Sequence, residues 1–155
     1  MRKLNPEFVR AMNQLMNNCP FYSLLSMKIQ EVTDEYVILE IDIKEKHLHA
    51  FNFVHGGVFA SIIDSATFWA VFYKVDDPDA ALVSVDLKVN FLARADSGRL
   101  KAKARSIRIG RKLGYAEAEV RNENGRLLAH GTSTLMILSG KGVIDHIKLP
   151  PKFLD

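Results

Sequence analysis

Cysteine is almost absent from the sequence, with Cys19 the single one among 155 residues. One thiol can form neither an intrachain disulfide framework nor a cysteine-rich metal site. We expect Cys19 to be a small buried side chain. The histidines do not form a ligand set typical of metal sites, so we expect no metal and no bound cofactor.

Long hydrophobic runs and a strong excess of one charge are also missing. The N-terminus has no apolar segment of the secretory type. The longest weakly charged stretch, 56–73, contains Asp64 and three hydroxyl residues, which argues against a membrane span. The 21 basic and 18 acidic residues give a net charge of +3, too small to indicate nucleic-acid binding. We therefore expect a cytoplasmic protein without membrane or nucleic-acid partners.

Hydrophobic periodicity predicts two helices in the first half of the chain. The first covers 5–18 and begins at Asn5-Pro6, an N-cap followed by proline at the first helical position. The second, Gly56 to Tyr73, is apolar on most sides and is therefore expected to be buried. Between the helices, alternating residues predict two short strands within 27–44, followed by a polar loop over 46–52.

Four more strands are predicted after the second helix. The clearest, Val83 to Phe91, alternates without interruption, and a change of phase in the next indicates a bulge near Ser106. Strands grouped around one long helix favour an α+β fold in which an antiparallel sheet is wrapped around the buried helix. We expect a single domain over 1–155, with its core over about 27–139 and an unassigned C-terminal tail over 140–155.

Asp64 is the single formally charged residue between His55 and Lys74. A buried, unpaired carboxylate is costly, so it must be hydrogen-bonded, raised in pKa or directed into a cavity. It is either a structural aspartate or a general base or nucleophile in a cleft.

The motif His55-Gly56-Gly57 forms the entrance to the same helix. The first N–H groups of a helix lack intrahelical partners and carry the positive end of the dipole. Because glycine lets a ligand approach the backbone closely, this entrance could hold a developing oxyanion. The alternative is that the two glycines only form a tight turn.

The spacing of these two features predicts a dimer. Gly57 and Asp64 lie on one face of the helix, but seven residues correspond to a rise of about 10 Å. A carbonyl held at Gly57 is therefore beyond the reach of Asp64 in the same chain. If both act in one reaction, Asp64 comes from a second subunit with an antiparallel helix, which implies a two-fold homodimer or a dimer of dimers.

The segment His55-Gly-Gly-Val-Phe-Ala-Ser-Ile-Ile-Asp64 resembles the hotdog-fold acyl-CoA thioesterases, specifically the PaaI-like (phenylacetyl-CoA thioesterase) branch. The strand up to Phe91, Gly110-Arg111 and Ala129-His-Gly-Thr lie where that family has similar segments, so the resemblance covers about residues 35–138. It implies a hotdog fold and hydrolysis of an acyl-CoA to the free acid and coenzyme A, which is part of the substrate.

The resemblance also implies roles for individual residues. The Gly57 N–H would polarise the thioester carbonyl, and His55 would order the surrounding loop and contact the substrate. Asp64 of the neighbouring subunit would activate water or attack directly. Ser84 matches a hydroxyl position that in some members helps to hold the water.

Two positions depart from the family pattern. His49 lies where the family often has Asn or Gln, six residues before His55. Asn52 lies where it usually has glycine. Either side chain could still hydrogen-bond the reacting groups.

A basic run without acids extends from Arg99 to Lys112. The phosphates of coenzyme A would be attracted to it. Arg111 and Lys112, which follow a glycine in a turn, are the best candidates for phosphate contacts, together with Gly56 at the helix entrance. The alternative is a solvated strand face balanced by neighbouring acids.

Two other functions remain open at this point. The chain could be a non-catalytic hotdog module that binds acyl-CoA or a fatty acid, which the replacement at His49 keeps open. It could also be a hotdog dehydratase acting on a hydroxyacyl thioester, with His55 and Asp64 as the proton-transfer pair. Steady-state release of thiol separates hydrolysis from binding.

Overall fold

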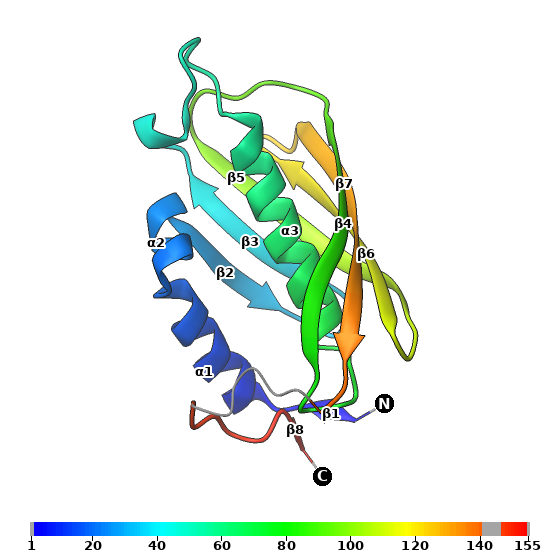
Figure 1. Ribbon diagram of the computed structural model, residues 1–155. Helices are drawn as coiled ribbons and strands as arrows, with labels where there is room; N and C mark the ends of the chain where they lie inside the picture. Colours follow the sequence, from blue (N-terminus) through cyan, green and yellow to red (C-terminus); the bar gives the residue numbers. More distant parts are fainter. Residues whose placement is uncertain (1, 141–146, 155) are drawn as a thin grey trace.

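The computed structural model describes residues 2–140 and 147–154. An antiparallel six-stranded sheet, in the order β2-β3-β5-β6-β7-β4, curves around the long helix α3 (Gly56–Phe72) (Figure 1). The strands are β2 (Met27–Val32), β3 (Val37–Asp42), β4 (Ala81–Phe91), β5 (Arg99–Ile109), β6 (Leu113–Arg121) and β7 (Leu127–Leu138). The predicted α+β architecture, an antiparallel sheet wrapped around one helix, is confirmed.

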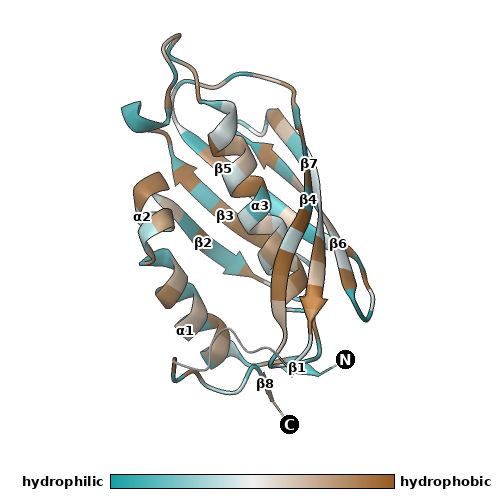
Figure 2. Ribbon diagram, in the orientation of Figure 1, coloured by the Kyte–Doolittle hydropathy of each residue, from teal (hydrophilic) through white to brown (hydrophobic). Residues whose placement is uncertain are grey.

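The core lies between α3 and the sheet. Ile62 and Ile63 of α3 are fully buried, and hydrophobic residues follow the helix along its length (Figure 2). The central strands face it with fully buried alanines, including Ala102, Ala104 and Ala116. Small side chains at these alternating positions allow the helix to lie close to the middle of the sheet.

The face of α3 that the chain leaves uncovered differs from the prediction of a helix buried on most sides. Ten of its 17 residues are buried, but a stripe along one side is partly or fully exposed. We call this the α3 stripe, and it consists of Gly57, Ala60, Ser61, Asp64, Ser65 and Phe68. The spacing of three and four residues places all six on one face. No helix in the described part of the chain is long and apolar enough to cross a membrane.

The N-terminal helices α1 (Pro6–Asn17) and α2 (Pro20–Leu25) lie beside β2 (Figure 1). The sequence predicts the first but not α2, because a proline after a helix usually marks its end, whereas Pro20 begins the next helix. The Trp69 indole N–H donates a 2.8 Å hydrogen bond to the Tyr22 hydroxyl, which joins α2 to α3.

The C-terminal tail returns to the N-terminus. Strand β8 (Phe153–Leu154) pairs with β1 (Lys3–Leu4), so the two ends of the chain lie together. The preceding Lys152 is buried and donates hydrogen bonds of 2.7 Å to the carbonyls of Phe72 and Val75 at the end of α3. The part of the tail over 141–146 lies outside the described residues. A three-residue helix, η1 (Glu45–His47), opens the loop before α3.

Candidate active site

His55 caps the N-terminus of α3. Its Nδ1 accepts a 2.8 Å hydrogen bond from Gly57 N–H, and its carbonyl accepts one of 2.9 Å from Val58 N–H. The resemblance implies that the Gly57 N–H polarises the thioester carbonyl. In this structure, that N–H already donates to His55. None of the hydrogen bonds among residues 2–140 and 147–154 uses the N–H of Gly56, the first residue of the helix. Gly56 is thus the backbone donor left at the positive end of α3.

Backbone N–H groups also fix the ring orientation of the two loop histidines. His49 Nδ1 accepts from Phe51 N–H at 3.0 Å, and His47 Nδ1 accepts from Lys44 N–H at 2.9 Å. A neutral imidazole whose Nδ1 accepts carries its proton on Nε2. The Nε2–H of His47 donates to the Leu25 carbonyl at 2.7 Å, and burial lowers the pKa of the His47 ring. His49 is half-buried, and within 2–140 and 147–154 no hydrogen bond uses its Nε2.

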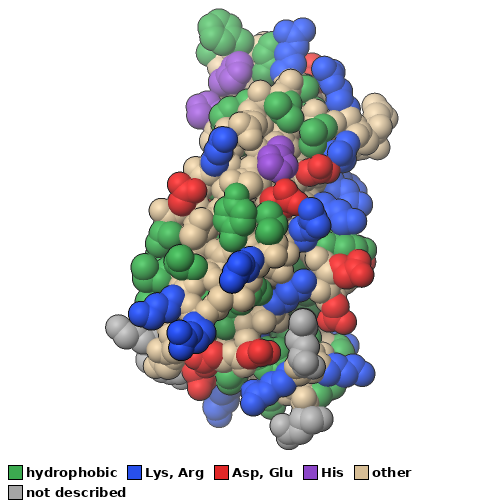
Figure 3. Space-filling model, turned by 90° about the vertical axis from the view of Figure 1, so that its right-hand side faces the viewer, with side chains coloured by type: hydrophobic (Ala, Val, Ile, Leu, Met, Phe, Trp, Pro, Cys, Tyr) green, Lys and Arg blue, Asp and Glu red, His purple; other side chains and the backbone are tan. Residues whose placement is uncertain are grey.

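Asn52, between His49 and His55, has an unusual backbone conformation. Asn52 has a φ of 62°, in the left-handed region that glycine and asparagine adopt most readily. Its N–H donates to the His49 carbonyl at 2.9 Å. The rings of His49 and His55 are 6.4 Å apart, and Figure 3 shows two histidine side chains close together near this end of the molecule. The conformation of Asn52 thus fits the position where the family usually has glycine.

A pocket of about 400 Å³ adjoins the free donors at the start of α3. Gly56 and His49 line it on one side, and its walls are mostly apolar, formed by Phe53, Val54, Phe59, Phe91, Leu92 and Ala93. A Cβ at Gly56 would lie 3.1 Å from the Phe91 ring, so glycine is what keeps the donor accessible beside that ring. Apolar walls with a few polar groups at one point are typical of small-molecule sites.

Arg94 is a residue of this pocket that the sequence analysis missed. Its guanidinium lies 4.5 Å from the centre of the Phe53 ring, a cation–π contact. The backbone on both sides is held by Ala93 N–H to Leu128 O and Val54 N–H to Ala95 O. The sequence around Arg94 does not indicate that it lines a pocket, because Phe53, which it contacts, is far away in the sequence.

Asp64 lies in the middle of the α3 stripe, away from the pocket. It is half-buried, and its carboxylate takes part in no hydrogen bond or ion pair among the described residues. No described side-chain polar atom is both buried and unpartnered, so the carboxylate is reached by solvent. Asp64 is eight residues after Gly56, a rise of about 12 Å along the helix. One chain therefore does not bring the two together.

The remaining predicted site residues lie elsewhere in the chain. Ser84 is exposed on β4, and no hydrogen bond within the described ranges joins it to Asp64. Arg111 and Lys112 lie in the β5–β6 hairpin. The hairpin is at the opposite end of α3 from Gly56, because a Cβ at Gly114 would meet Val71 near the end of that helix.

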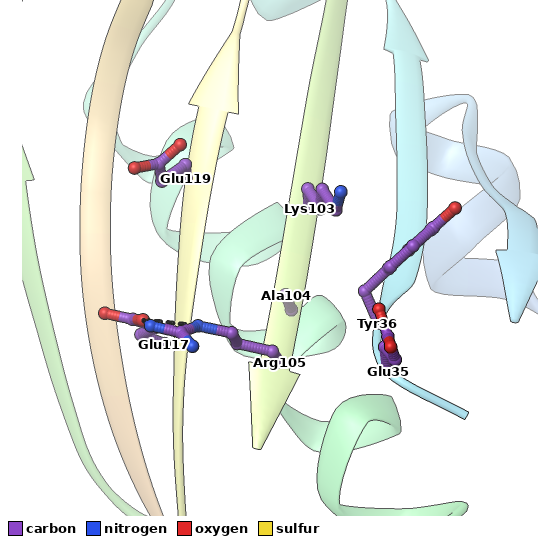
Figure 4. A pocket seen from close by; sticks show the side chains of 7 residues that line it. All are labelled: Glu35, Tyr36, Lys103, Ala104, Arg105, Glu117 and Glu119. Carbon is purple, nitrogen blue, oxygen red and sulfur yellow. Dashed lines mark hydrogen bonds and ion pairs between the residues drawn. The ribbon is translucent and has the colours of Figure 1, made fainter. Parts of the chain in front are cut away.

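The outer face of the sheet, opposite α3, carries a second hollow, which is lined by basic and acidic side chains together: Lys103, Arg105, Glu35, Glu117 and Glu119. Arg105 forms an ion pair of 2.6 Å with Glu117 (Figure 4), and His130 Nε2 is 3.2 Å from the same carboxylate. Hydrogen bonds from His130 and Arg105 lower the pKa of Glu117. The interpretation of the basic run as a face balanced by neighbouring acids therefore applies to Arg105. The described residues hold no cluster of three or more His, Cys, Asp or Glu suited to a metal ion.

Comparison with known proteins identifies the family and the fold. Residues 51–129 match the thioesterase superfamily. Mouse acyl-coenzyme A thioesterase 13 is 26% identical over 81% of this chain and 91% of its own length. A thioesterase family protein from Silicibacter pomeroyi is 28% identical with a TM-score of 0.77, covering 86% of this chain and 99% of that chain. A thioesterase from Haemophilus influenzae shares the fold at 20% identity, with a TM-score of 0.79 over 96% of this chain and 100% of that chain. The expected hotdog fold is confirmed.

Proposed function

Because the chain belongs to the thioesterase superfamily, we propose that it hydrolyses the thioester bond of an acyl-CoA and releases a carboxylic acid and coenzyme A. The observation that supports this most directly is the pocket at the start of α3. There, the unengaged Gly56 N–H and the His49 ring line a cavity of about 400 Å³ with aromatic walls. Such a cavity fits an acyl or pantetheine chain whose carbonyl needs hydrogen-bond donors.

The carbonyl oxygen of the thioester binds at Gly56 and His49. The Gly56 N–H is at the positive end of the α3 dipole, and His49 contributes its Nε2–H in place of the amide that the family often has. Both donors stabilise the negative charge that develops on this oxygen as the tetrahedral intermediate forms. His55 keeps Gly57 N–H bonded and so orders the first turn.

Asp64 of the partner subunit supplies the base. It accepts a proton from a water molecule as the water oxygen attacks the carbonyl carbon, and the Ser84 hydroxyl helps to hold this water, as the resemblance implies.

 The C–S bond then breaks, and the proton passes to the departing coenzyme A sulfur. The hydroxyl group of the water thus ends on the carboxylic acid and its other hydrogen on the thiol.

A second copy of the chain is required by this arrangement. The α3 stripe is uncovered and contains small residues that allow another helix to approach closely. Next to it, β4 is an edge strand of 11 residues with exposed apolar side chains, among them Val85 (51% exposed), Leu87 (37%) and Phe91 (60%). Long apolar edges pair readily with another chain. We propose that two copies meet through these surfaces with their α3 helices antiparallel, which brings each Gly56 near the partner's acid.

Thiol release from a panel of acyl-CoA substrates tests the proposal, with Asp64→Asn as the variant and Asp34→Asn as the matched control in the exposed β2–β3 turn. We expect Asp64→Asn to lower kcat by about 100-fold or more, as loss of a general base does, with unchanged circular dichroism and sedimentation. Asp34→Asn should keep wild-type activity. Full activity in Asp64→Asn would refute the mechanism. Tight binding without turnover by the wild type would instead identify a non-catalytic acyl-CoA module.

A further inference from the structure

One charged side chain interrupts the apolar walls of the pocket at the start of α3. Of the described residues that line this pocket, Arg94 alone carries a formal charge. It forms no ion pair within residues 2–140 and 147–154. Asp96, an acid two positions further along the chain, does not line the pocket and accepts a 2.8 Å hydrogen bond from the Ser97 hydroxyl. The pocket therefore contains a positive charge without a counter-charge.

Contacts with the Phe53 segment fix the position of Arg94. The guanidinium carbon lies over the Phe53 ring, 4.5 Å from its centre, and a 2.8 Å hydrogen bond from Val54 N–H to Ala95 O joins the two segments. Figure 3 shows basic side chains near the two histidines at this end of the molecule. A guanidinium over an aromatic ring keeps the N–H groups at its edge available, in a planar fork that matches a carboxylate. Arg94 is thus prepared to bind a carboxylate at the pocket.

The distance between Arg94 and His49 indicates which part of a substrate meets the cation. The Phe53 ring, which Arg94 contacts, has its centre 6.1 Å from the centre of the His49 ring, so one aromatic ring separates the guanidinium from the proposed carbonyl donor. The extended pantetheine arm of coenzyme A holds its first phosphate about 15 Å from the sulfur, by ordinary bond lengths. With the thioester carbonyl at His49, the phosphates therefore lie well beyond Arg94. A negative charge that meets Arg94 then belongs to the acyl group.

We propose that Arg94 makes the enzyme selective for acyl groups that end in a second carboxylate, and that its guanidinium binds this carboxylate. The proposal rests on the proposed function, which supplies the thioester and the donors to its carbonyl. The methylene groups of the acyl chain pack against the aromatic walls, among them Phe53 and Phe91. In an extended six-carbon chain the first and last carbons are about 6 Å apart, which suits a carbonyl at His49 and a carboxylate at Arg94.

The first test compares the adipyl and hexanoyl thioesters of N-acetylcysteamine. Both have six-carbon acyl groups and no phosphate, and the adipyl group alone carries a carboxylate. We expect the wild type to favour the adipyl thioester in kcat/KM by about fivefold, which an exposed ion pair of good geometry can supply. Arg94→Gln should abolish this preference. Arg10→Gln, which removes an exposed charge on α1, should retain it. Equal kcat/KM values in the wild type, or a preference that survives in Arg94→Gln, would overturn the proposal.

Reversal of the charge at this position gives a second test. Arg94→Glu should favour the 6-aminohexanoyl thioester of N-acetylcysteamine over the adipyl thioester, whereas the wild type should favour the adipyl thioester. The preference of the wild type should also decrease as salt is added, because salt screens an exposed ion pair. The same order of substrates in both proteins would show that the end of the acyl chain does not meet residue 94.

Coenzyme A thioesters test whether Arg94 binds the phosphates instead of the acyl group. If it does, Arg94→Gln should raise the KM for hexanoyl-CoA and leave the ratio between the adipyl and hexanoyl thioesters of N-acetylcysteamine at its wild-type value. That result would overturn the proposal. A fall of this ratio, with a similar fall of the ratio between adipyl-CoA and hexanoyl-CoA, would support it.

Binding measurements keep this inference separate from the proposed reaction. Hydrolysis of both thioesters at equal rates would leave the proposed function standing and refute the role of Arg94. If the wild type hydrolyses neither thioester, the proposed function fails, and calorimetry with the intact adipyl and hexanoyl thioesters then decides the inference. Tighter binding of the adipyl thioester that is lost in Arg94→Gln would still support the carboxylate site, and equal binding of the two would count against it.

Discussion

His55 and Gly57 are joined by a hydrogen bond of 2.8 Å between the imidazole Nδ1 and the backbone N–H. The His55 side chain thus accepts from the second N–H of α3, that of Gly57. The first N–H, that of Gly56, has no partner among the described residues. The bond stabilises the helix start and determines which of the two glycine N–H groups is left for the proposed contact with a substrate oxygen.

Replacement of His55 should therefore destabilise the helix start. His55→Ala removes the acceptor, and loss of an N-cap costs about 1 kcal/mol of the free energy of unfolding. His55→Asn, whose side chain is a favourable N-cap, should keep most of the stability. Urea unfolding of the three proteins measures the difference. Equal midpoints for wild type and His55→Ala would show that the cap does not contribute.

Gly56→Ala should block the pocket without destabilising the fold. The added Cβ would lie 3.1 Å from the Phe91 ring, so the ring must shift toward the cavity. Alanine is more favourable than glycine in a helix by up to about 1 kcal/mol, so the variant should remain folded. We expect kcat/KM for acyl-CoA to fall by about an order of magnitude, following the sensitivity of catalysis to small displacements. Phe91→Val in the same chain should restore activity in part; no recovery would mean that the ring is not the obstacle.

Leu87→Arg should dissociate the proposed dimer. Leu87 is on the edge strand β4, and a charge there opposes pairing with a second apolar edge. Sedimentation should show a monomer, and activity should be lost because Gly56 and Asp64 separate. The matched control is Gln30→Arg on β2, the other edge of the sheet, which should leave the sedimentation coefficient unchanged. A dimeric, active Leu87→Arg protein would contradict the interface.

Lys152 should make stability increase with pH in the alkaline range. Burial lowers its pKa from 10.5 to about 8. Between these values the folded protein releases a proton that the unfolded chain keeps, so the free energy of unfolding rises with pH, by about 3 kcal/mol over the whole interval. Urea unfolding between pH 7.5 and 9.5 should show this rise in wild type and in Lys148→Met, an exposed control in the same tail. It should be much smaller in Lys152→Met; the same slope in all three would exclude Lys152 as its source.

The sequence predicted most of the sheet because its strands have a period of two. The bulge expected near Ser106 is confirmed by a register shift between Ser106 and Arg108. Val83 to Phe91 is indeed a strand, but its side chains are largely exposed, since β4 is at the edge of the sheet. Periodicity indicates that a strand has two different faces. It does not indicate whether the rest of the chain covers either of them.

The elements that the sequence did not predict depend on contacts between distant residues. Strands β1 and β8 have two residues each, too short for any pattern, and exist because the chain ends pair. At the site, the cap by His55 had a usable signal, since an N-cap side chain accepts from the second or third N–H of its helix. Applied to His55, that rule predicts that the Gly57 N–H has a partner and that the Gly56 N–H is the donor left for a ligand.

The loop before α3 begins at an acceptor that is lost in acid. His47 accepts Lys44 N–H at Nδ1, and protonation of its ring, whose pKa burial lowers, would fill that position. An asparagine or glutamine at such a place would be indifferent to mild acid. In acid, the start of this loop would therefore lose the hydrogen bond between Lys44 N–H and His47.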